Sequence, residues 1–305
     1  MKIGLLDVDS YHFPNLPLMK LSAYHKAQGD TVEWWSETGS YDRVYMSKVF
    51  DETYTSDIPE PVNAAEIVKG GTGYGLENRL PDEIEHTYPD YSLYPKLTKD
   101  TAYGFLTRGC CRGCSFCIVS AKEGRQSRKV ADLSEFWSGQ KHIKLLDPNL
   151  LACPDHPALL EQLAASSAYV DFTQGLDARL LTPDNIALLN RVRKSNIHFA
   201  WDYMSESQEV LEGLNLYAKL TNKKLHGNYG TVYCLTNYGT TMEENLHRVE
   251  VLDRMGYNPY IMIYDKPNAP RELRQLQRWC NSIRIRKMVP KFEDYRGGIK
   301  KCNTS

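Results

Sequence analysis

Four of the eight cysteines lie within eight positions, in residues 107–119, whose sequence is TRGCCRGCSFCIV. Cys110, Cys114 and Cys117 have the spacing C-x3-C-x2-C, so one tight loop can turn three thiolates toward a single centre. Thiolates in such an array are ligands for zinc and for iron–sulfur clusters. The spacing therefore predicts a metal centre on this loop.

The kind of metal centre follows from the number of ligands. A structural zinc ion usually has four protein ligands, and the chain offers no second C-x2-C pair or nearby histidine pair. Cys111 directly follows Cys110, and neighbouring residues cannot easily point both side chains at one ion. Three cysteines on a 4Fe-4S cluster leave one iron open to a substrate or cofactor. We therefore favour a 4Fe-4S cluster over zinc or an inert group of thiols.

Composition limits the class of protein. The chain has 305 residues, 42% of them hydrophobic, which is enough for one large domain or for a large and a smaller one. The 37 basic and 38 acidic residues nearly cancel, so no overall field attracts nucleic acid or an anionic membrane, although a local basic patch stays open. Residues 1–13 lack the apolar core of a signal peptide, and no apolar run reaches membrane-spanning length.

The remaining cysteines support a reducing compartment. They are scattered, unlike the evenly spread framework of a short secreted protein, at Cys153, Cys234, Cys280 and Cys302. We expect a cytoplasmic protein with no membrane partner.

The first 75 residues predict a small Rossmann-like α/β domain. A strand over 2–8 is followed by a helix over 17–30, with Pro17 in its first turn and Gly29 as its stop, and by a strand over 31–35. A strand candidate over 42–50 and the glycine-ended run 64–75 extend this pattern. Residues 76–100, rich in Pro, Tyr and acidic residues, are expected to be a connector across a surface.

A different pattern of predicted elements begins at residue 101 and continues to about residue 290. Residues 291–305 are expected to form a C-terminal tail. Six short β-rich runs alternate with six helical runs; the strands are expected at 101–107, 142–147, 169–174, 197–202, 230–237 and 260–265, and the helices at 132–140, 156–166, 182–195, 205–220, 241–256 and 270–283. Thr182 and Ser205 are expected N-caps and Gly256 a C-cap. Right-handed crossovers would curl such parallel strands into a full or partial TIM-like (β/α)6 barrel.

Chemistry in such a barrel belongs at the carboxyl ends of the strands. The first predicted strand leads to the cysteines. The later ones end in polar or aromatic residues, which are Asp147 and Asn149, Gln174 and Asp177, Trp201 and Asp202, Thr236 and Asn237, and Tyr264 and Asp265. Strand ends are also polar because solvent begins there, so each residue alone has a plain structural explanation. Their joint placement with the thiols favours a site.

The cysteine array, with Phe116 directly before Cys117 and six β-α pairs in residues 101–290, resembles the radical S-adenosylmethionine (radical SAM) enzymes. The resemblance implies that Cys110, Cys114 and Cys117 bind a catalytic 4Fe-4S cluster whose fourth iron is chelated by the amino and carboxylate groups of SAM. An electron from a donor such as flavodoxin or ferredoxin would then cleave SAM to methionine and a 5'-deoxyadenosyl radical. That radical would take hydrogen from an unidentified substrate, and Phe116 would flank the adenine.

Other SAM contacts follow from the same resemblance. Where family members commonly carry a Gly-Gly-Glu type segment for the SAM amino group, this chain reads LLDPNLL, so Asp147 or Asn149 would substitute. In QGLDARL, Gln174, Asp177 and Arg179 suit the ribose and carboxylate of SAM, although Asp177 and Arg179 could instead form a structural ion pair. Asp202 is a further expected cofactor ligand.

Basic residues after the cysteines form a second set of candidates. Arg125 or Arg128 could bind the SAM carboxylate or an anionic substrate, the alternative being an ordinary solvated face.

The amino-terminal part resembles the radical SAM group with a cobalamin-binding-type domain, which includes uncharacterised bacterial and phage members. The resemblance rests on MKIGLLDVD, the helix from Pro17, the GGTG turn at 70–73 and PDYSLYP at 89–95. The D-x-H-x-x-G signature is absent, and His12 and His25 stand in a different context. We therefore expect a vestigial domain and treat cobalamin as a possible but not favoured cofactor.

Hydrogen abstraction from a small-molecule or macromolecular substrate is the leading hypothesis. The alternatives are a cobalamin-dependent radical SAM methyltransferase and a non-catalytic iron–sulfur binding protein. Nucleic-acid modification is only weakly suggested by the basic segment 283–292, and the tRNA methylthiotransferases are disfavoured because no cysteine precedes Cys110. Candidates for the substrate pocket, against ordinary barrel packing, are Tyr233, Asn237, Tyr260 and Tyr264.

Overall fold

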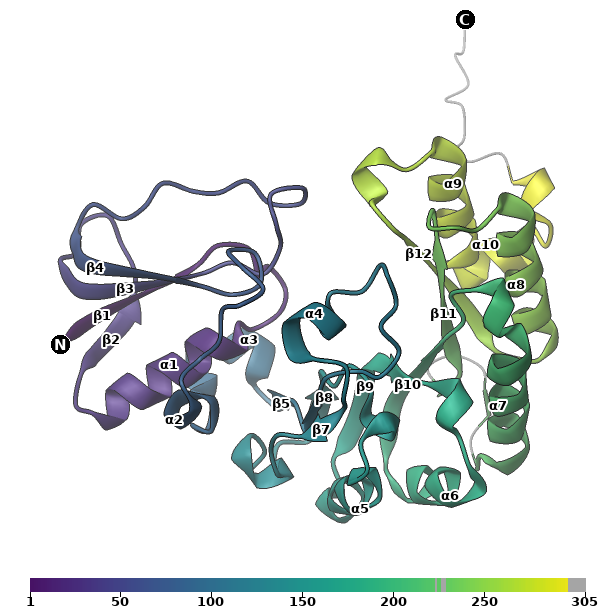
Figure 1. The fold of residues 1–305 in the computed structure, drawn as a ribbon, viewed down its shortest axis with the longest axis horizontal. Helices are drawn as coiled ribbons and strands as arrows, with labels where there is room; N and C mark the ends of the chain where they lie inside the picture. Colours follow the sequence, from purple (N-terminus) through teal and green to yellow (C-terminus); the bar gives the residue numbers. More distant parts are fainter. Residues whose placement is uncertain (223, 226–228, 296–305) are drawn as a thin grey trace, which may run out of the picture. The chain divides into compact units, whose positions relative to one another are not determined.

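The computed structural model describes residues 1–222, 224–225 and 229–295. Its contacts divide the chain into two compact units, Met1–Gly113 with Ile118–Asp147, and Cys114–Cys117 with Pro148–Ser305. Each unit is α/β and contains parallel strands (Figure 1). The boundaries predicted at 75, 100 and 290 stay predictions, and most of the predicted tail, with Cys302, lies outside the described residues.

The first unit contains a four-stranded sheet. The strands are β1 (Lys2–Asp7), β2 (Thr31–Trp34), β3 (Tyr41–Ser47) and β4 (Ala64–Gly70), and their order is β2-β1-β3-β4. Every neighbouring pair is parallel, so the chain must cross over between strands. The structure thus confirms a parallel α/β sheet in this part of the chain, and its classification as a Rossmann-like domain over residues 1–75 stays a prediction.

Helix α1 (Leu16–Ala27) makes the first crossover, and local sequence sets its ends. The side chain of Asn15 accepts a hydrogen bond from the Leu18 amide at 3.2 Å, and Pro17 stands in the first turn. After the helix, Gly29 takes a positive φ of 83°. The helix buries Leu18 and Leu21 in a cluster with Ile3, Leu5 and Ile84.

The connector after β4 packs closely onto this unit. It contains α2 (Asp82–Glu85), the 3₁₀ turn η1 (Tyr91–Leu93) and α3 (Pro95–Thr98). Asp90 accepts hydrogen bonds from Ser22 and Lys26 of α1, each at 2.6 Å, and the Tyr94 hydroxyl donates to Asp7 at 2.6 Å. These bonds hold the connector against α1 and the end of β1.

Two further strand pairs complete the first unit. β5 (Thr101–Gly104) runs parallel to β8 (His142–Leu145), and β6 (Thr107–Arg108) is antiparallel to β7 (Arg128–Lys129), with the short helix α4 (Val119–Glu123) between β6 and β7. The helix expected over 132–140 is wrong. Only the 3₁₀ turn η2 (Leu133–Glu135) forms there, because Gly139 turns the chain at φ 112°.

The second unit contains four neighbouring parallel strands in chain order, β9 (Tyr169–Leu176), β10 (Lys194–Ala200), β11 (Thr231–Thr236) and β12 (Asn258–Ile263). The helices before, between and after them are α5 (His156–Ser166), α6 (Pro183–Arg191), α7 (Ser207–Leu220), α8 (Met242–Arg254), α9 (Arg271–Cys280) and α10 (Ile283–Met288). The 3₁₀ turns are η3 (Leu150–Ala152), η4 (Ala178–Leu180), η5 (Met204–Glu206), η7 (Lys266–Asn268) and η8 (Phe292–Asp294).

Alternation along these strands separates two faces. Val170, Phe172, Ile197, Phe199 and Val232 are buried, and the Phe199 ring packs edge-on to Tyr217 of α7 at 5.0 Å. The residues between them face the other way and are polar or aromatic. One face of the sheet is therefore the helix-covered core, and the other carries the side chains that could do chemistry.

The predicted caps in this unit had mixed outcomes. Thr182 caps α6, accepting from the Asn185 amide at 3.2 Å, and Gly256, at φ 84°, follows the end of α8. Ser205 as a cap is wrong, because it lies inside η5 and Glu206 precedes the first residue of α7. The strands and helices alternate as predicted, whereas closure into a partial barrel stays a prediction.

Within the described residues, we find no helix that combines the length and apolar character needed to cross a membrane.

Candidate functional site

The cysteine loop leaves from β6 and returns to β7, and its base is closed by hydrogen bonds. The Cys110 amide donates to the Gly124 carbonyl at 3.2 Å, and the Gly109 amide donates to Glu123 Oε2 at 2.9 Å. Gly109 has φ 89°, and a Cβ there would lie 2.2 Å from the Gln126 carbonyl oxygen. Only glycine fits this position, so the sequence RGC fixes where the loop begins.

The arm of the loop, Cys114–Cys117, belongs to the second unit. It closes as a turn, with the Cys117 amide donating to the Cys114 carbonyl at 3.0 Å. The Phe116 ring lies 5.8 Å from that of Tyr203 and 5.6 Å from that of Tyr238. The Tyr238 hydroxyl donates to Ser115 Oγ at 2.9 Å. Phe116 is thus part of a half-exposed aromatic cluster, which the sequence did not reveal beyond Phe116 itself.

The donor set of the loop suits an iron–sulfur cluster. Cys110, Cys114 and Cys117 are half-buried thiols, and Cys111 is exposed. Across residues 1–222, 224–225 and 229–295, no three His, Cys, Asp or Glu side chains are gathered in a way that could hold a metal ion. Cluster binding by the three cysteines therefore rests on their chemistry and spacing and stays a prediction.

Asp147 is buried directly after β8, and its carboxylate holds the chain that enters the cysteine loop. Oδ1 accepts from the Thr107 amide at 2.5 Å, from the Thr107 hydroxyl at 2.7 Å and from the Leu106 amide at 3.1 Å. Burial raises the pKa of Asp147 to about 6, although these hydrogen bonds act to lower it. The side chain is thus engaged with the backbone, and its predicted role toward SAM stays untested.

Asn149, Asp177 and Arg179 lie together in the second unit. Asn149 Nδ2 donates to Asp177 Oδ2 at 3.5 Å, and Arg179 contacts both carboxylate oxygens of Asp177, at 2.7 and 3.2 Å. Arg179 also pairs with Glu206. The ion pair weighed as the alternative for Asp177 and Arg179 is therefore present, and their contact with SAM stays a prediction.

Gln174 and Asp202 have different surroundings. Gln174 is exposed and lies inside β9, two residues before its end. Asp202 follows β10, and its Oδ1 accepts from the Leu235 amide at 3.0 Å. Burial raises the pKa of Asp202, which the backbone bond and Arg248 partly offset. The Gln174 side chain is exposed, whereas that of Asp202 is half-buried.

Arg248 of α8 is a positioning residue that the sequence analysis missed. It is fully buried and donates to the carbonyls of Trp201, Asp202 and Leu235 at 2.6, 3.1 and 2.8 Å. It thereby ties together the carboxyl ends of β10 and β11. The signal was present in the sequence, since Arg248 falls on the buried helical stripe with Asn245, Val249 and Leu252.

The predicted substrate residues form two clusters in the second unit. Tyr264 packs on Tyr238 at 4.8 Å, and Asn237 Nδ2 donates to the Tyr264 carbonyl at 2.9 Å. Tyr233 lies edge-on to Tyr260 at 5.7 Å and is stacked on His198 at 4.9 Å.

His198 and Asp171, which the sequence analysis did not single out, extend the second cluster. His198 Nδ1 lies 3.1 Å from the Phe172 carbonyl and 3.9 Å from Asp171 Oδ1. Asp171 Oδ2 accepts from Asn196 at 3.0 Å. Because the Phe172 carbonyl can only accept, Nδ1 is the donor in this contact.

The two candidate arginines in the basic loop differ. Arg128 donates to the Glu123 carbonyl at 2.9 Å. The Arg125 guanidinium lies against Gly113, where a Cβ would come within 2.6 Å of Nη2, and in the part of the chain that the structure describes it has no hydrogen bond or ion pair. Of the two, Arg125 is the cation available to an anion.

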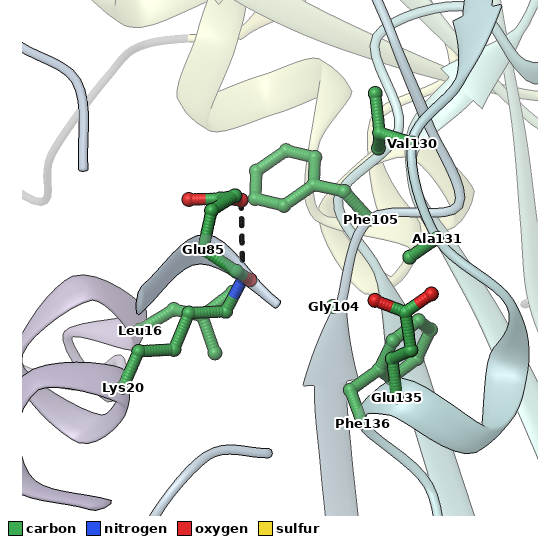
Figure 2. Close-up of a pocket in the computed structure, with 9 residues that line it drawn as sticks. All are labelled: Leu16, Lys20, Glu85, Gly104, Phe105, Val130, Ala131, Glu135 and Phe136. Atoms are coloured by element: carbon green, nitrogen blue, oxygen red, sulfur yellow. Dashed lines mark hydrogen bonds and ion pairs between the residues drawn. The ribbon is translucent and has the colours of Figure 1, made fainter. Parts of the chain in front are cut away.

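The first unit contains a small cavity. Figure 2 shows Lys20 and Glu85 bonded to each other within its lining, which is Leu16, Lys20, Glu85, Gly104, Phe105, Val130, Ala131, Glu135 and Phe136. Its volume of about 20 Å³ suits a water molecule. The cavity is too small for SAM or another organic ligand.

Comparison with known proteins shows similarity of fold. No family model and no curated protein matches the sequence. The solved structure of the radical S-adenosylmethionine methyltransferase TsrM from Kitasatospora setae, with cobalamin and a [4Fe-4S] cluster bound, matches with a TM-score of 0.62. The match covers 86% of this chain and 74% of that chain at 11% sequence identity. The chain therefore has a fold similar to that of TsrM.

Proposed function

We propose that the protein is a radical SAM enzyme. The observation that carries the proposal is the C-x3-C-x2-C array of Cys110, Cys114 and Cys117, on a loop with a fixed base, in a chain whose fold is similar to that of TsrM. Bound to these thiolates, a 4Fe-4S cluster would supply the electron for reductive cleavage of SAM. Closure of residues 101–290 into a partial (β/α)6 barrel after a Rossmann-like domain is part of the same proposal.

The chain's own residues would bind and orient SAM. Phe116, supported by Tyr203 and Tyr238, offers an apolar wall for the adenine ring and would exclude water from it. We assign the SAM carboxylate to Arg125, because Arg179 is already neutralised by two carboxylates. Gln174 is exposed and can hydrogen-bond the ribose.

Anaerobic reconstitution tests the proposal. We expect wild-type protein to bind iron and inorganic sulfide and, with SAM and a strong reductant, to release methionine and 5'-deoxyadenosine. Serine at Cys110, Cys114 or Cys117 should abolish this reaction, while Cys111→Ser should retain it. Protein that binds zinc without sulfide, or a cluster-loaded protein that releases no 5'-deoxyadenosine, would refute the proposal; the second result would favour a non-catalytic iron–sulfur protein.

Cobalamin-dependent methylation is the second candidate, and the fold comparison favours it more than the sequence did. TsrM is a methyltransferase whose structure contains cobalamin. With this fold, cobalamin is no longer a disfavoured cofactor for this chain. Cobalamin-dependent methylation needs a bound corrinoid, whereas hydrogen abstraction does not. Incubation with hydroxocobalamin and measurement of corrinoid absorption in the desalted protein therefore separates the two reactions.

The other assignments stay proposals. They are a cytoplasmic location, a flavodoxin or ferredoxin as electron donor, and a substrate of unknown size. Nucleic-acid binding through residues 283–292 has little support, because Arg286 in this segment is buried and donates to the Pro259 and Cys280 carbonyls at 3.2 and 2.8 Å. A salt-dependent binding assay with RNA and DNA tests it.

A further inference from the structure

Four charged side chains of the first unit form a row of ion pairs that runs from α1 to the base of the cysteine loop. Lys20 of α1 lies 3.1 Å from Glu85 at the end of α2, and Glu85 lies 3.2 Å from Arg108 of β6. Arg108 lies 2.8 Å from Glu123 at the end of α4. The charges alternate in sign along this row, so Glu85 and Arg108 each lie between two groups of opposite charge.

These groups are more shielded from water than an ordinary surface ion pair. Their side chains are 12%, 29%, 23% and 9% exposed in the order Lys20, Glu85, Arg108 and Glu123. Lys26, also on α1, pairs with Asp90 but is 46% exposed. Shielded pairs are screened less by salt and water, and removing one partner leaves the other charge uncompensated.

Arg108 connects two carboxylates through the shape of its guanidinium group. Nη1 contacts Glu123 and Nη2 contacts Glu85, while the group lies over the Phe105 ring at 3.9 Å from its centroid. A lysine keeps the positive charge but offers one nitrogen on a flexible stem. It cannot hold two carboxylates in this fixed arrangement.

Glu123 transfers this restraint to the backbone beside a proposed ligand. Its Oε1 accepts from Arg108, and its Oε2 accepts from the Gly109 amide at 2.9 Å. Gly109 has a backbone conformation that other residues rarely adopt, and the next amide, that of Cys110, is bonded to the Gly124 carbonyl. The Arg108–Gly109 peptide, one residue before Cys110, is thus held by a carboxylate that the Arg108 side chain holds in turn.

We propose that Lys20, Glu85, Arg108 and Glu123 are positioning residues that hold Cys110 in its cluster-binding conformation. The inference rests on the proposed function, because it assumes that Cys110 is a ligand. It adds that α1, far away in the sequence, helps to retain the cluster. The same contacts could instead only stabilise the folded unit, so the test must separate cluster retention from overall stability.

The experiment measures loss of the cluster from the reconstituted full-length protein. Iron released to a chelator under anaerobic conditions is followed for wild type, Lys20→Met, Arg108→Lys and Glu123→Gln, with Lys26→Met as the matched control on α1. We expect Lys20→Met, Arg108→Lys and Glu123→Gln each to release iron at least about fivefold faster than wild type, because charge-assisted hydrogen bonds are strong and directional. The release rate of the control should stay within about twofold of the wild-type rate. The double variant Lys20→Met/Arg108→Lys should release iron no faster than Arg108→Lys alone.

Two further readouts keep the result interpretable. The thermal midpoint of each apo protein reports overall stability, and the EPR spectrum of the reduced cluster with and without SAM reports its ligand environment. We expect changed release rates and EPR spectra at a thermal midpoint close to that of wild type. If Lys20→Met does not fold, Lys20→Gln takes its place, because it also removes the charge that faces Glu85.

The outcomes separate this inference from the proposed function. Wild-type protein that takes up no iron and sulfide refutes the proposed function. A wild-type cluster with release rates within twofold in all three variants overturns the positioning role alone. Faster release in strict proportion to a lower thermal midpoint, with unchanged EPR spectra, also overturns it, because general destabilisation then explains the effect.

Discussion

The Asp147 carboxyl group is buried, and its contribution to the free energy of unfolding should depend on pH. Burial raises its pKa from 3.8 to about 6, so between these values the folded protein binds more protons than the unfolded one. Stability from this group is therefore present below about pH 4 and is lost as the pH rises through 6. We expect wild type to lose about 2 kcal/mol relative to Asp147→Asn between pH 4 and pH 7.

Denaturant unfolding of both proteins across this pH range measures the difference. Asn can keep the Oδ1 acceptor used by Leu106 and Thr107, so the variant should fold. Other carboxylates titrate equally in both proteins and cancel. A difference in unfolding free energy that does not change with pH would contradict the prediction.

Arg125 is expected to matter more for SAM binding than Arg128. Arg125 has no ion pair or hydrogen bond within the described residues, whereas Arg128 donates to the Glu123 carbonyl. A guanidinium paired with a carboxylate in a shielded site contributes about 1.5–3 kcal/mol. Arg125→Ala should therefore raise the Kd for SAM at least tenfold, and Arg128→Ala less than threefold, by equilibrium binding to the reconstituted protein. Equal effects of the two changes on the Kd for SAM would contradict the assignment of the SAM carboxylate to Arg125.

At the level of elements, the turn Cys114–Cys117 depends on the aromatic residues around it. Tyr238 supports it twice, through its ring against Phe116 and its hydroxyl bond to Ser115. Tyr238→Phe keeps the ring and should leave SAM affinity within about twofold. Tyr238→Ala also removes the wall behind Phe116 and should raise the Kd for SAM about fivefold, since an aromatic contact contributes about 0.5–1.5 kcal/mol beyond its buried area.

The comparison of Phe and Ala at this position isolates the ring. If Tyr238→Phe weakens SAM binding as much as Tyr238→Ala, the hydroxyl bond to Ser115 is what supports the turn. If neither change affects binding, Phe116 does not flank the adenine.

Much of the element order could be predicted from the sequence, because local periodicity and caps determine it. Thr182 followed by Pro183 and Asn185 predicts the start of α6, and the structure has this capping box. The helix predicted over 132–140 failed because residues 136–140 turn sharply at Gly139. Ser205 failed because an additional 3₁₀ turn precedes α7. Both errors concern segments where several short-range patterns compete.

The site could be predicted only in part. The cysteines and Phe116 form a short local motif, so their spacing was informative. The bonds of Asp147 to Leu106 and Thr107, the bonds of Arg248 to backbone carbonyls and the pair of His198 and Asp171 join residues that are 13 or more positions apart. A single sequence carries no record of such contacts, and only the fold brings these residues together.

At the level of the whole chain, the open question with the largest consequence is cobalamin. The part of the chain outside the TsrM match is too short to contain all of residues 2–70, so at least part of this segment lies inside the match. In parallel α/β sheets, ligands bind at the carboxyl ends of the strands near a reversal of strand order, and the order β2-β1-β3-β4 has such a reversal at β1 and β3. The fold is therefore compatible with a cofactor there.

A histidine beneath the cobalt is not expected, even if cobalamin binds. His25 is buried, and its two ring nitrogens lie 2.7 Å from Asp30 and 2.9 Å from the Tyr45 hydroxyl, so neither is available to a metal. His12 is exposed outside the D-x-H-x-x-G pattern. If protein incubated with hydroxocobalamin retains corrinoid after desalting, we expect no histidine nitrogen coupling in the EPR spectrum of the cob(II)alamin form and equal binding by His12→Ala. Corrinoid lost on desalting would leave hydrogen abstraction as the favoured reaction, and histidine coupling lost in His12→Ala would show that His12 is the ligand.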